Sequence, residues 1–239
     1  MEFVELLNIP KCPEQRIPVA EIVRQIEATS TEKKSLETHI ASMYLVSILN
    51  QQTIKIRPYK DDMYSYQSIY IFDIKLKKED SLKDFCKLVH SAFPEPTILL
   101  LTYKKRNYIS FATKRINKLD ETKTVVEEVV NSELKTEKDI SEYLNIGEAL
   151  GNNLKEYYGG LIDLIYKLKV YYITGVYPSK TMDYEMIIKQ YEDLTVVIKQ
   201  LKQSYNQATM MAEKIKIDNE LYDKEIELKK LKKNIRGEN

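Results

Sequence analysis

The sequence lacks tryptophan, and its 239 residues include only two cysteines, two histidines and six glycines. Cys12 and Cys86 form no CxxC motif, so we expect two free thiols and no structural zinc site, which would need four ligands. The glycines form neither a GxGxxG nor a phosphate-loop motif, which argues against nucleotide and dinucleotide chemistry. His39 and His90 lie on predicted helices without a nearby nucleophile. We therefore expect no cofactor and no metal.

The chain also lacks a long uncharged apolar run and a strong net charge. Its most apolar stretch, residues 159–176, contains Asp163, Lys167 and Lys169, which argue against a membrane span. Residues 1–10 have no basic stretch followed by an apolar core, so they are not typical of a signal peptide. Because the formal charge is only +1, any nucleic-acid site must be local. We expect a cytoplasmic protein with no membrane partner.

What is present is an α+β pattern. Helical periodicity and apolar–polar alternation predict, in order, helix 16–28, helix 30–50, strand 53–59, strand 68–77, helix 79–93 and a two-stranded hairpin over 96–115. Residues 124–134 fit either a strand, because they are rich in β-branched residues, or a helix, because of their acidic spacing. This α-α-β-β-α-β-β order predicts a mainly antiparallel sheet in an α+β domain of residues 1–135.

Residues 136–239 predict helices only, over 139–150, over 160–174 and from Thr181 or Asp183 onwards, in a coiled-coil-like interaction region. Apolar residues then recur at alternating spacings of three and four. The predicted interaction residues of this seam are Leu194, Ile198, Leu201, Tyr205, Ile215, Tyr222 and Ile226. A second seam takes over near the end, formed by Ile217, Leu221, Leu228, Leu231 and Ile235.

Such a stripe must be buried against something. One alternative is an intrachain antiparallel pair of helices that turns near Asn206. The other is a coiled coil with a second copy or with a larger protein. The basic end, LKKLKKNIR, either touches nucleic acid or is a solvated helix face whose lysines the helix dipole favours.

Asp73 and Lys75 are the one pair with a catalytic pattern, because residues two apart on a strand share a face. In PD-(D/E)xK nucleases a strand-borne Asp-x-Lys shares a magnesium site with an upstream carboxylate, which Asp61 or Asp62 could supply. The alternative is an ordinary strand over 68–77 whose charged pair lies where one face leaves the core. We expect the second, so magnesium would be a cofactor only under the nuclease alternative.

Residues 103–118 are the best candidate for nucleic-acid binding. The predicted binding residues are Lys104, Lys105, Arg106, Lys114, Arg115 and Lys118. Tyr103, Tyr108 and Phe111 are interleaved with them, and such a mixture can contact phosphates and stack on bases. The alternative is a solvated hairpin whose charges discourage edge pairing and whose rings lie in the core.

Three stretches, taken in order, resemble a bacterial family of unknown function, domain-of-unknown-function family 4391. They are NIPKCPEQRIPVAEIV near the N-terminus, SILNQQTIKI followed by IYIFDIKLKK, and the closing MMAEKIKIDNELYDKEIELKKLKKN. Asp73 matches an acidic position of that family, whereas its basic position two residues later is variable. The genes of such families often accompany helicases and DNA methyltransferases in defence islands. The resemblance thus implies a non-enzymatic accessory subunit that docks such a protein and contacts DNA; a nuclease and a structural homodimer stay as alternatives.

Overall fold

The structure is a computed structural model that describes residues 5, 7–136, 142–144, 146, 151–178 and 182–236. The chain forms two compact units, residues 1–165 and residues 166–239. The boundary falls within helix α7 (Leu154–Thr174), on the C-terminal side of the boundary that we expected after residue 135. Most of the helix predicted over 139–150 lies outside the described residues.

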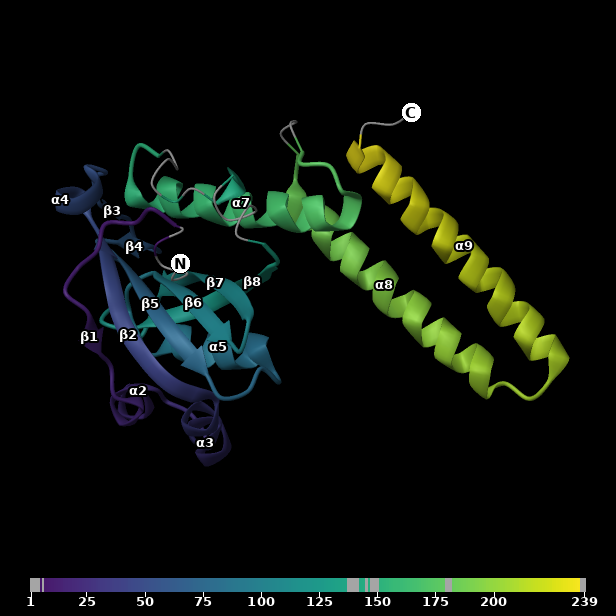
Figure 1. Cartoon of the computed structure of the whole chain (residues 1–239), viewed down its shortest axis with the longest axis horizontal. Helices are drawn as coiled ribbons and strands as arrows, with labels where there is room; N and C mark the ends of the chain where they lie inside the picture. Colours follow the sequence, from purple (N-terminus) through teal and green to yellow (C-terminus); the bar gives the residue numbers. More distant parts are fainter. Residues whose placement is uncertain are drawn as a thin grey trace. The chain divides into compact units, whose positions relative to one another are not determined.

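The first unit is built on a mixed sheet with the strand order β1-β2-β5-β6-β7-β8 (Figure 1). Its strands are β1 (Gln15–Arg16), β2 (Ile40–Leu49), β5 (Ile69–Leu76), β6 (Thr97–Tyr103), β7 (Arg106–Ile116) and β8 (Thr124–Leu134). Strands β5 and β6 are parallel, because helix α5 (Leu82–Ser91) carries the chain back between them. The other described neighbours are antiparallel, which confirms the predicted α+β class.

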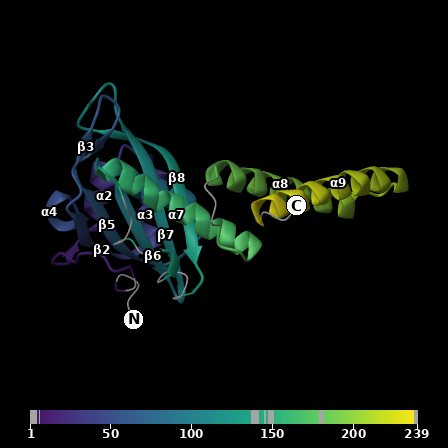
Figure 2. The same ribbon diagram turned by 90° about the horizontal axis from the view of Figure 1, so that it is seen from above.

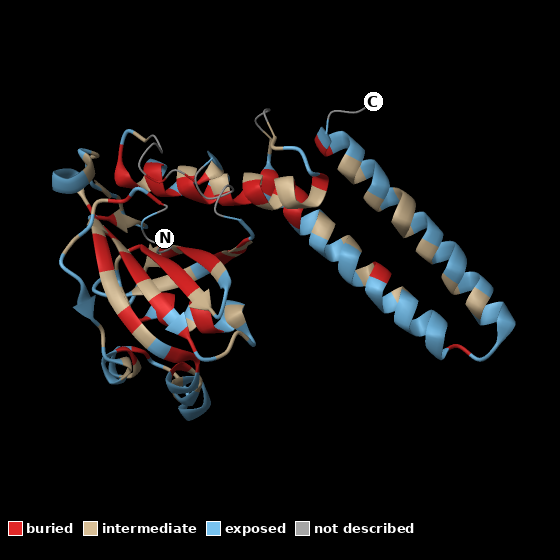
Figure 3. Ribbon diagram, viewed as in Figure 1, coloured by how far each residue is buried: buried red, intermediate tan, exposed pale blue. Residues whose placement is uncertain are grey.

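Helices α2 (Val19–Gln25), α3 (Ser30–His39) and α5 cover one face of this sheet. Thr29 and Glu32 form a capping box that begins α3. From α5, Phe85 and Val89 are buried in the core between these helices and the strands. This burial of apolar side chains is the main stabilising contribution in the first unit, and the sheet is largely buried in Figure 3.

The prediction of one helix over 30–50 was wrong in its second half. Helix α3 ends at His39, and the chain continues directly as β2. The His39 ring lies within hydrogen-bond distance of the Ser35 and Asp80 carbonyl oxygens, at 2.7 and 2.9 Å. Strand β2 pairs with β5 along nearly its whole length. A pairing partner some thirty residues away therefore overrides the helical spacing of the local sequence.

The strand predicted over 53–59 was also wrong. Residues Gln51–Ile54 form one helical turn, α4, which Asn50 caps by accepting hydrogen bonds from two backbone N–H groups. Lys55 ends this turn in the left-handed conformation, with φ of 62°. The next regular structure is a small ribbon of β3 (Tyr59–Lys60) and β4 (Ser65–Tyr66).

The first turns of α7 lie against the other face of the sheet (Figure 2). The fully buried hydroxyl of Tyr158 accepts a hydrogen bond from the Ala112 N–H and donates to the Thr97 carbonyl, at 3.0 and 2.8 Å. Ala112 and Thr97 lie just beyond Ile98↔Phe111, the last paired residues of β6 and β7. The tyrosine hydroxyl thus bridges these strands where their own ladder stops.

The second unit contains the end of α7 and an antiparallel pair of long helices, α8 (Tyr184–Gln207) and α9 (Met211–Arg236). Asp183 caps α8 by accepting a hydrogen bond from the Met186 N–H. The turn between the helices lies just after Gln207, close to the turn near Asn206 that the intrachain alternative required. At the other end, the Arg236 guanidinium donates to the Thr174 carbonyl at 2.7 and 3.0 Å and fastens α9 to the end of α7.

Candidate functional site

Strand β5 presents Asp73 and Lys75 on one face, as their spacing predicts. Phe72 and Ile74 are buried in the helix-covered core, so the alternate residues belong to the opposite face of the sheet. Asp73 is half-buried opposite Tyr44 of β2, and Lys75 is exposed. The geometry therefore agrees with the predicted strand, whose charged end reaches solvent.

The upstream carboxylates that a magnesium site would need are engaged elsewhere or isolated. Asp61 accepts hydrogen bonds from the Tyr59 hydroxyl and from the N–H groups of Met63 and Tyr64, at 2.6, 2.8 and 2.6 Å. The Tyr59 hydrogen bond is the main reason why the pKa of Asp61 falls to about 2. Asp62 is exposed in the same turn. Over the described part of the chain, no three His, Cys, Asp or Glu side chains gather as metal ligands would.

The predicted nucleic-acid hairpin has its tip at Lys104 and Lys105, between Tyr103 of β6 and Arg106 of β7. Arg106 donates to both oxygens of Glu133, at 2.9 and 3.0 Å, and to Glu79 at 2.7 Å. Because two carboxylates balance its charge and accept its hydrogen bonds, this guanidinium attracts a phosphate only weakly. Lys104, Lys105 and Lys118 are the exposed members of the predicted set that form no ion pair with the residues that the structure describes.

Two more residues of the predicted nucleic-acid-binding set, Lys114 and Arg115, interact with other groups of the first unit. Lys114 is 3% exposed, and its ammonium donates to the carbonyl oxygens of Phe93 and Glu95 at 2.9 and 2.6 Å. Arg115 lies 3.6 Å from Glu127. The rings of Tyr108 and Phe111 are buried as well, which leaves Tyr103 near the tip, where the Lys104 ammonium lies over its ring.

Lys114 also begins a buried polar chain that the sequence did not reveal. Its ammonium lies 3.3 Å from the Thr97 hydroxyl, which contacts His90 Nδ1; His90 Nε2 lies 2.9 Å from Ser110 Oγ, and Ser110 lies 2.6 Å from Asn131 Oδ1. Because the Ser110 hydroxyl donates to Asn131 Oδ1, it accepts from His90 Nε2, and this pattern favours the Nε2–H tautomer of His90.

This chain is structural rather than catalytic in its geometry. His90 and Ser110 are both fully buried, and Ser110 directs its proton to Asn131 rather than to the imidazole. Desolvation, with a further contribution from Lys114, lowers the pKa of His90 well below its ordinary value. Burial raises the pKa of the neighbouring Cys86 thiol to about 12, so this cysteine is unreactive. His90 lies on α5 and Ser110 lies on β7, and no sequence motif indicates that these two segments meet.

The predicted interaction seam is divided between two faces of the second unit. Leu194, Ile198 and Leu201 of α8 are buried or half-buried within the helical pair. On α9 the packing residues come from the second seam of the sequence. They are Ile217, Leu221, Leu228, Leu231 and Ile235, all half-buried or buried.

The remaining members of the first seam on α9 lie on the opposite side of that helix. Ile215 is 54% exposed and Tyr222 66% exposed, and Met211, at 72%, shares their face. Ile226 ends this outer stripe half-buried, and Tyr205 is 37% exposed near the turn between the helices. We call Met211, Ile215, Tyr222 and Ile226 the outer stripe of α9.

The described residues thus form an α+β unit and a pair of long helices, and no three His, Cys, Asp or Glu side chains among them gather as a metal site would require. The chain belongs to the family described as Domain of unknown function (DUF4391), whose model matches residues 7–234. No curated protein and no solved structure matches the chain. Among the described residues, no helix is both long enough and apolar enough to cross a lipid bilayer.

Proposed function

We propose that the protein is a non-enzymatic accessory subunit of a bacterial DNA-directed defence or restriction-like system. The α+β domain is the scaffold, and the α8–α9 pair docks a larger helicase or DNA methyltransferase. A contact with DNA is part of this proposal. The observation that carries the proposal is the outer stripe of α9, which leaves Ile215 and Tyr222 more than half exposed on a helix already packed on its other side.

An exposed stripe of this kind fits a partner helix. Its positions from Ile215 to Ile226 keep the four-three-four spacing of a coiled-coil seam, with Asn219 as a single polar member. Burying an aliphatic or aromatic side chain contributes about 1.5–3 kcal/mol. Two or three such residues are enough to give a helix-in-groove contact its central anchors.

The charges beside the stripe favour a different protein over a second copy. If two copies pair in parallel, Asp218 lies opposite Asp223 of the copy. If they pair antiparallel, Asp218 lies opposite Glu225 of the copy. In each orientation of the two helices, one pair of opposite charges also forms, and its attraction only offsets the repulsion between the acidic residues. A partner helix with Lys or Arg at the flanking positions forms opposite-charge pairs with Asp218 and Asp223, while Glu225 already pairs with Lys202 at 2.9 Å.

The test is binding to a purified helicase or DNA methyltransferase from the same genome. The double variant Ile215→Asp/Tyr222→Asp is expected to weaken binding at least about a hundredfold. A matched control, Gln203→Asp/Ser204→Asp, adds the same charge at exposed sites of α8 and should leave binding unchanged. Circular dichroism checks that both variants keep their helices.

Unchanged binding of the stripe variant would refute the docking surface. A wild-type dimer in sedimentation that the stripe variant converts to monomer would instead assign the stripe to a second copy. The nuclease alternative keeps one favourable observation, the shared face of Asp73 and Lys75 on β5.

A further inference from the structure

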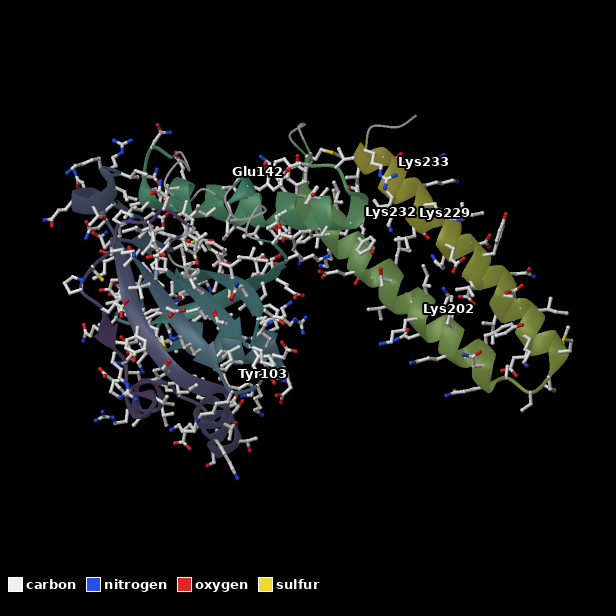
Figure 4. All side chains as sticks on the ribbon, viewed as in Figure 1. Tyr103, Glu142, Lys202, Lys229, Lys232 and Lys233 are labelled. Atoms are coloured by element: carbon white, nitrogen blue, oxygen red, sulfur yellow. The ribbon has the colours of Figure 1, made fainter. Side chains whose placement is uncertain are left out.

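The last turns of α9 concentrate positive charge, with no carboxylate among residues 228–236 themselves. Residues 228–236 contain five cations and no carboxylate, whereas residues 218–227 contain five carboxylates and Lys224 alone as a cation. Figure 4 shows Lys229, Lys232 and Lys233 on this part of α9. Charge is thus segregated along one helix, and a polyanion would be attracted to its C-terminal end and repelled from its middle.

The packing of the helical pair turns Lys229 and Lys233 outward, whereas Lys232 lies over the Tyr191 ring of α8. Leu231 and Ile235 face α8, and the Arg236 guanidinium holds the Thr174 carbonyl, so the rotation of the last turns is fixed. Lys229 and Lys233, four residues apart, therefore lie together on the outer side. Both are exposed, as is Lys230.

The carboxylates of the second unit that form ion pairs are paired with other cations. Glu192 pairs with Lys169 at 3.0 Å, and Glu225 pairs with Lys202 at 2.9 Å. Glu227 pairs with Lys224 at 2.8 Å. Within the described residues, Lys229, Lys230 and Lys233 form no ion pair, although Lys230 lines a groove between α8 and α9 together with Asp193 and Glu227.

We propose that Lys229, Lys230 and Lys233 bind the phosphate backbone of a nucleic acid. The proposal rests on the DNA contact of the proposed function, but it moves that contact from the β6–β7 hairpin to α9 and does not depend on the outer stripe. In the hairpin Arg106 is held by two glutamates and Lys114 is buried. On α9 the ammonium groups are available for phosphates, with no sequence readout expected.

A nucleic acid fits this surface better than a lipid bilayer. Membrane-surface helices place their lysines beside apolar side chains that enter the bilayer. Here the apolar residues of the same turns, Leu228, Leu231 and Ile235, are turned toward α8, and the outer side of these turns is polar. Within these last turns the outer surface can therefore bind phosphates but offers no apolar side chain to insert, because the outer stripe ends one turn earlier at half-buried Ile226.

The experiment is fluorescence anisotropy with a labelled DNA duplex of mixed sequence, over a series of salt concentrations. The triple variant Lys229→Gln/Lys230→Gln/Lys233→Gln is expected to weaken binding and to reduce the slope of log K against log salt by about 2–3, because each phosphate that is no longer neutralised reduces it by about 0.9. The control is Lys104→Gln/Lys105→Gln/Lys118→Gln, which removes the same charge from the hairpin. It should leave the slope nearly unchanged.

The outcomes separate the two proposals. If the wild-type protein binds no duplex, both the DNA contact of the proposed function and this inference fail. If the wild type binds and the hairpin control rather than the α9 variant loses affinity, the DNA contact stands and only the α9 surface is refuted. Binding of anionic phosphatidylserine vesicles without binding of duplex would overturn the choice of ligand.

Discussion

The stability of the first unit is expected to rise with pH above neutrality, and Lys114 is the reason. Its ammonium lies in the interior, where the carbonyl oxygens of Phe93 and Glu95 accept its hydrogen bonds. Burial lowers its pKa from 10.5 to about 7, because the charged form loses its hydration. In the unfolded chain the same lysine keeps its ordinary pKa. Between these two values, the unfolded state therefore binds one proton more than the folded state.

The sign and size of the effect follow from this difference. Stability rises with pH wherever the unfolded state binds more protons, by about 1.4 kcal/mol per pH unit for one proton. Below about pH 7, Lys114 is protonated in both states and contributes no slope. From about pH 7 to about pH 9, the wild type should gain about 2–3 kcal/mol relative to Lys114→Met, which carries no titrating group there.

Urea unfolding at a series of pH values measures this difference. Near-ultraviolet circular dichroism of the buried tyrosines follows the first unit, since the chain has no tryptophan. Lys118→Met, at an exposed position, serves as the control and should run parallel to the wild type. Parallel curves for the wild type and Lys114→Met would refute the reasoning, because they would mean that the ring of acceptor oxygens keeps Lys114 protonated in the folded state.

Two further predictions concern the sheet. Tyr158→Phe should cost about 2–4 kcal/mol in urea unfolding, because it leaves the Ala112 N–H and the Thr97 carbonyl buried without their bridge. Tyr157→Phe, which loses a bond to a single carbonyl, should cost about half as much; equal losses would argue against the bridge. Plasmid DNA incubated with Mg²⁺ should stay intact with the wild type and with Asp73→Ala. Cutting that disappears in Asp73→Ala would overturn the non-enzymatic proposal.

The sequence predicted those elements whose pattern is local. Strand β5 was identified by its alternation, and Phe72, Ile74 and Leu76 do face the core. Helix α5 was identified by its spaced apolar residues and the prolines after it. Residues 40–49 could not be assigned correctly in the same way, because their apolar residues fit both periods and the deciding contact is a strand far along the chain.

For the candidate sites as well, the sequence predicted features that depend on local spacing and missed those that depend on contacts between distant segments. Spacing placed Asp73 and Lys75 on one face, and it placed the cations near a hairpin tip. It could not show that Lys114 is buried, because that depends on carbonyl groups from the loop between α5 and β6. Nor could heptad spacing separate the packed seam of α9 from its outer stripe, since the turn after Gln207 divides the first seam between α8 and α9.

The bridge made by Tyr158 also bears on how the chain folds during synthesis. Its hydroxyl reaches backbone groups 46 and 61 residues earlier, at Ala112 and Thr97. The six strands have therefore all been made before the residue that joins β6 to β7 at this point is available, and contacts of such sequence separation form late. A fragment that ends near residue 135 keeps every described strand of the sheet but lacks α7, so the apolar face around Ala112 and Thr97 that Tyr158 covers is exposed to solvent. Such a fragment would resemble a nascent chain waiting for its next helix, and it should be prone to aggregate.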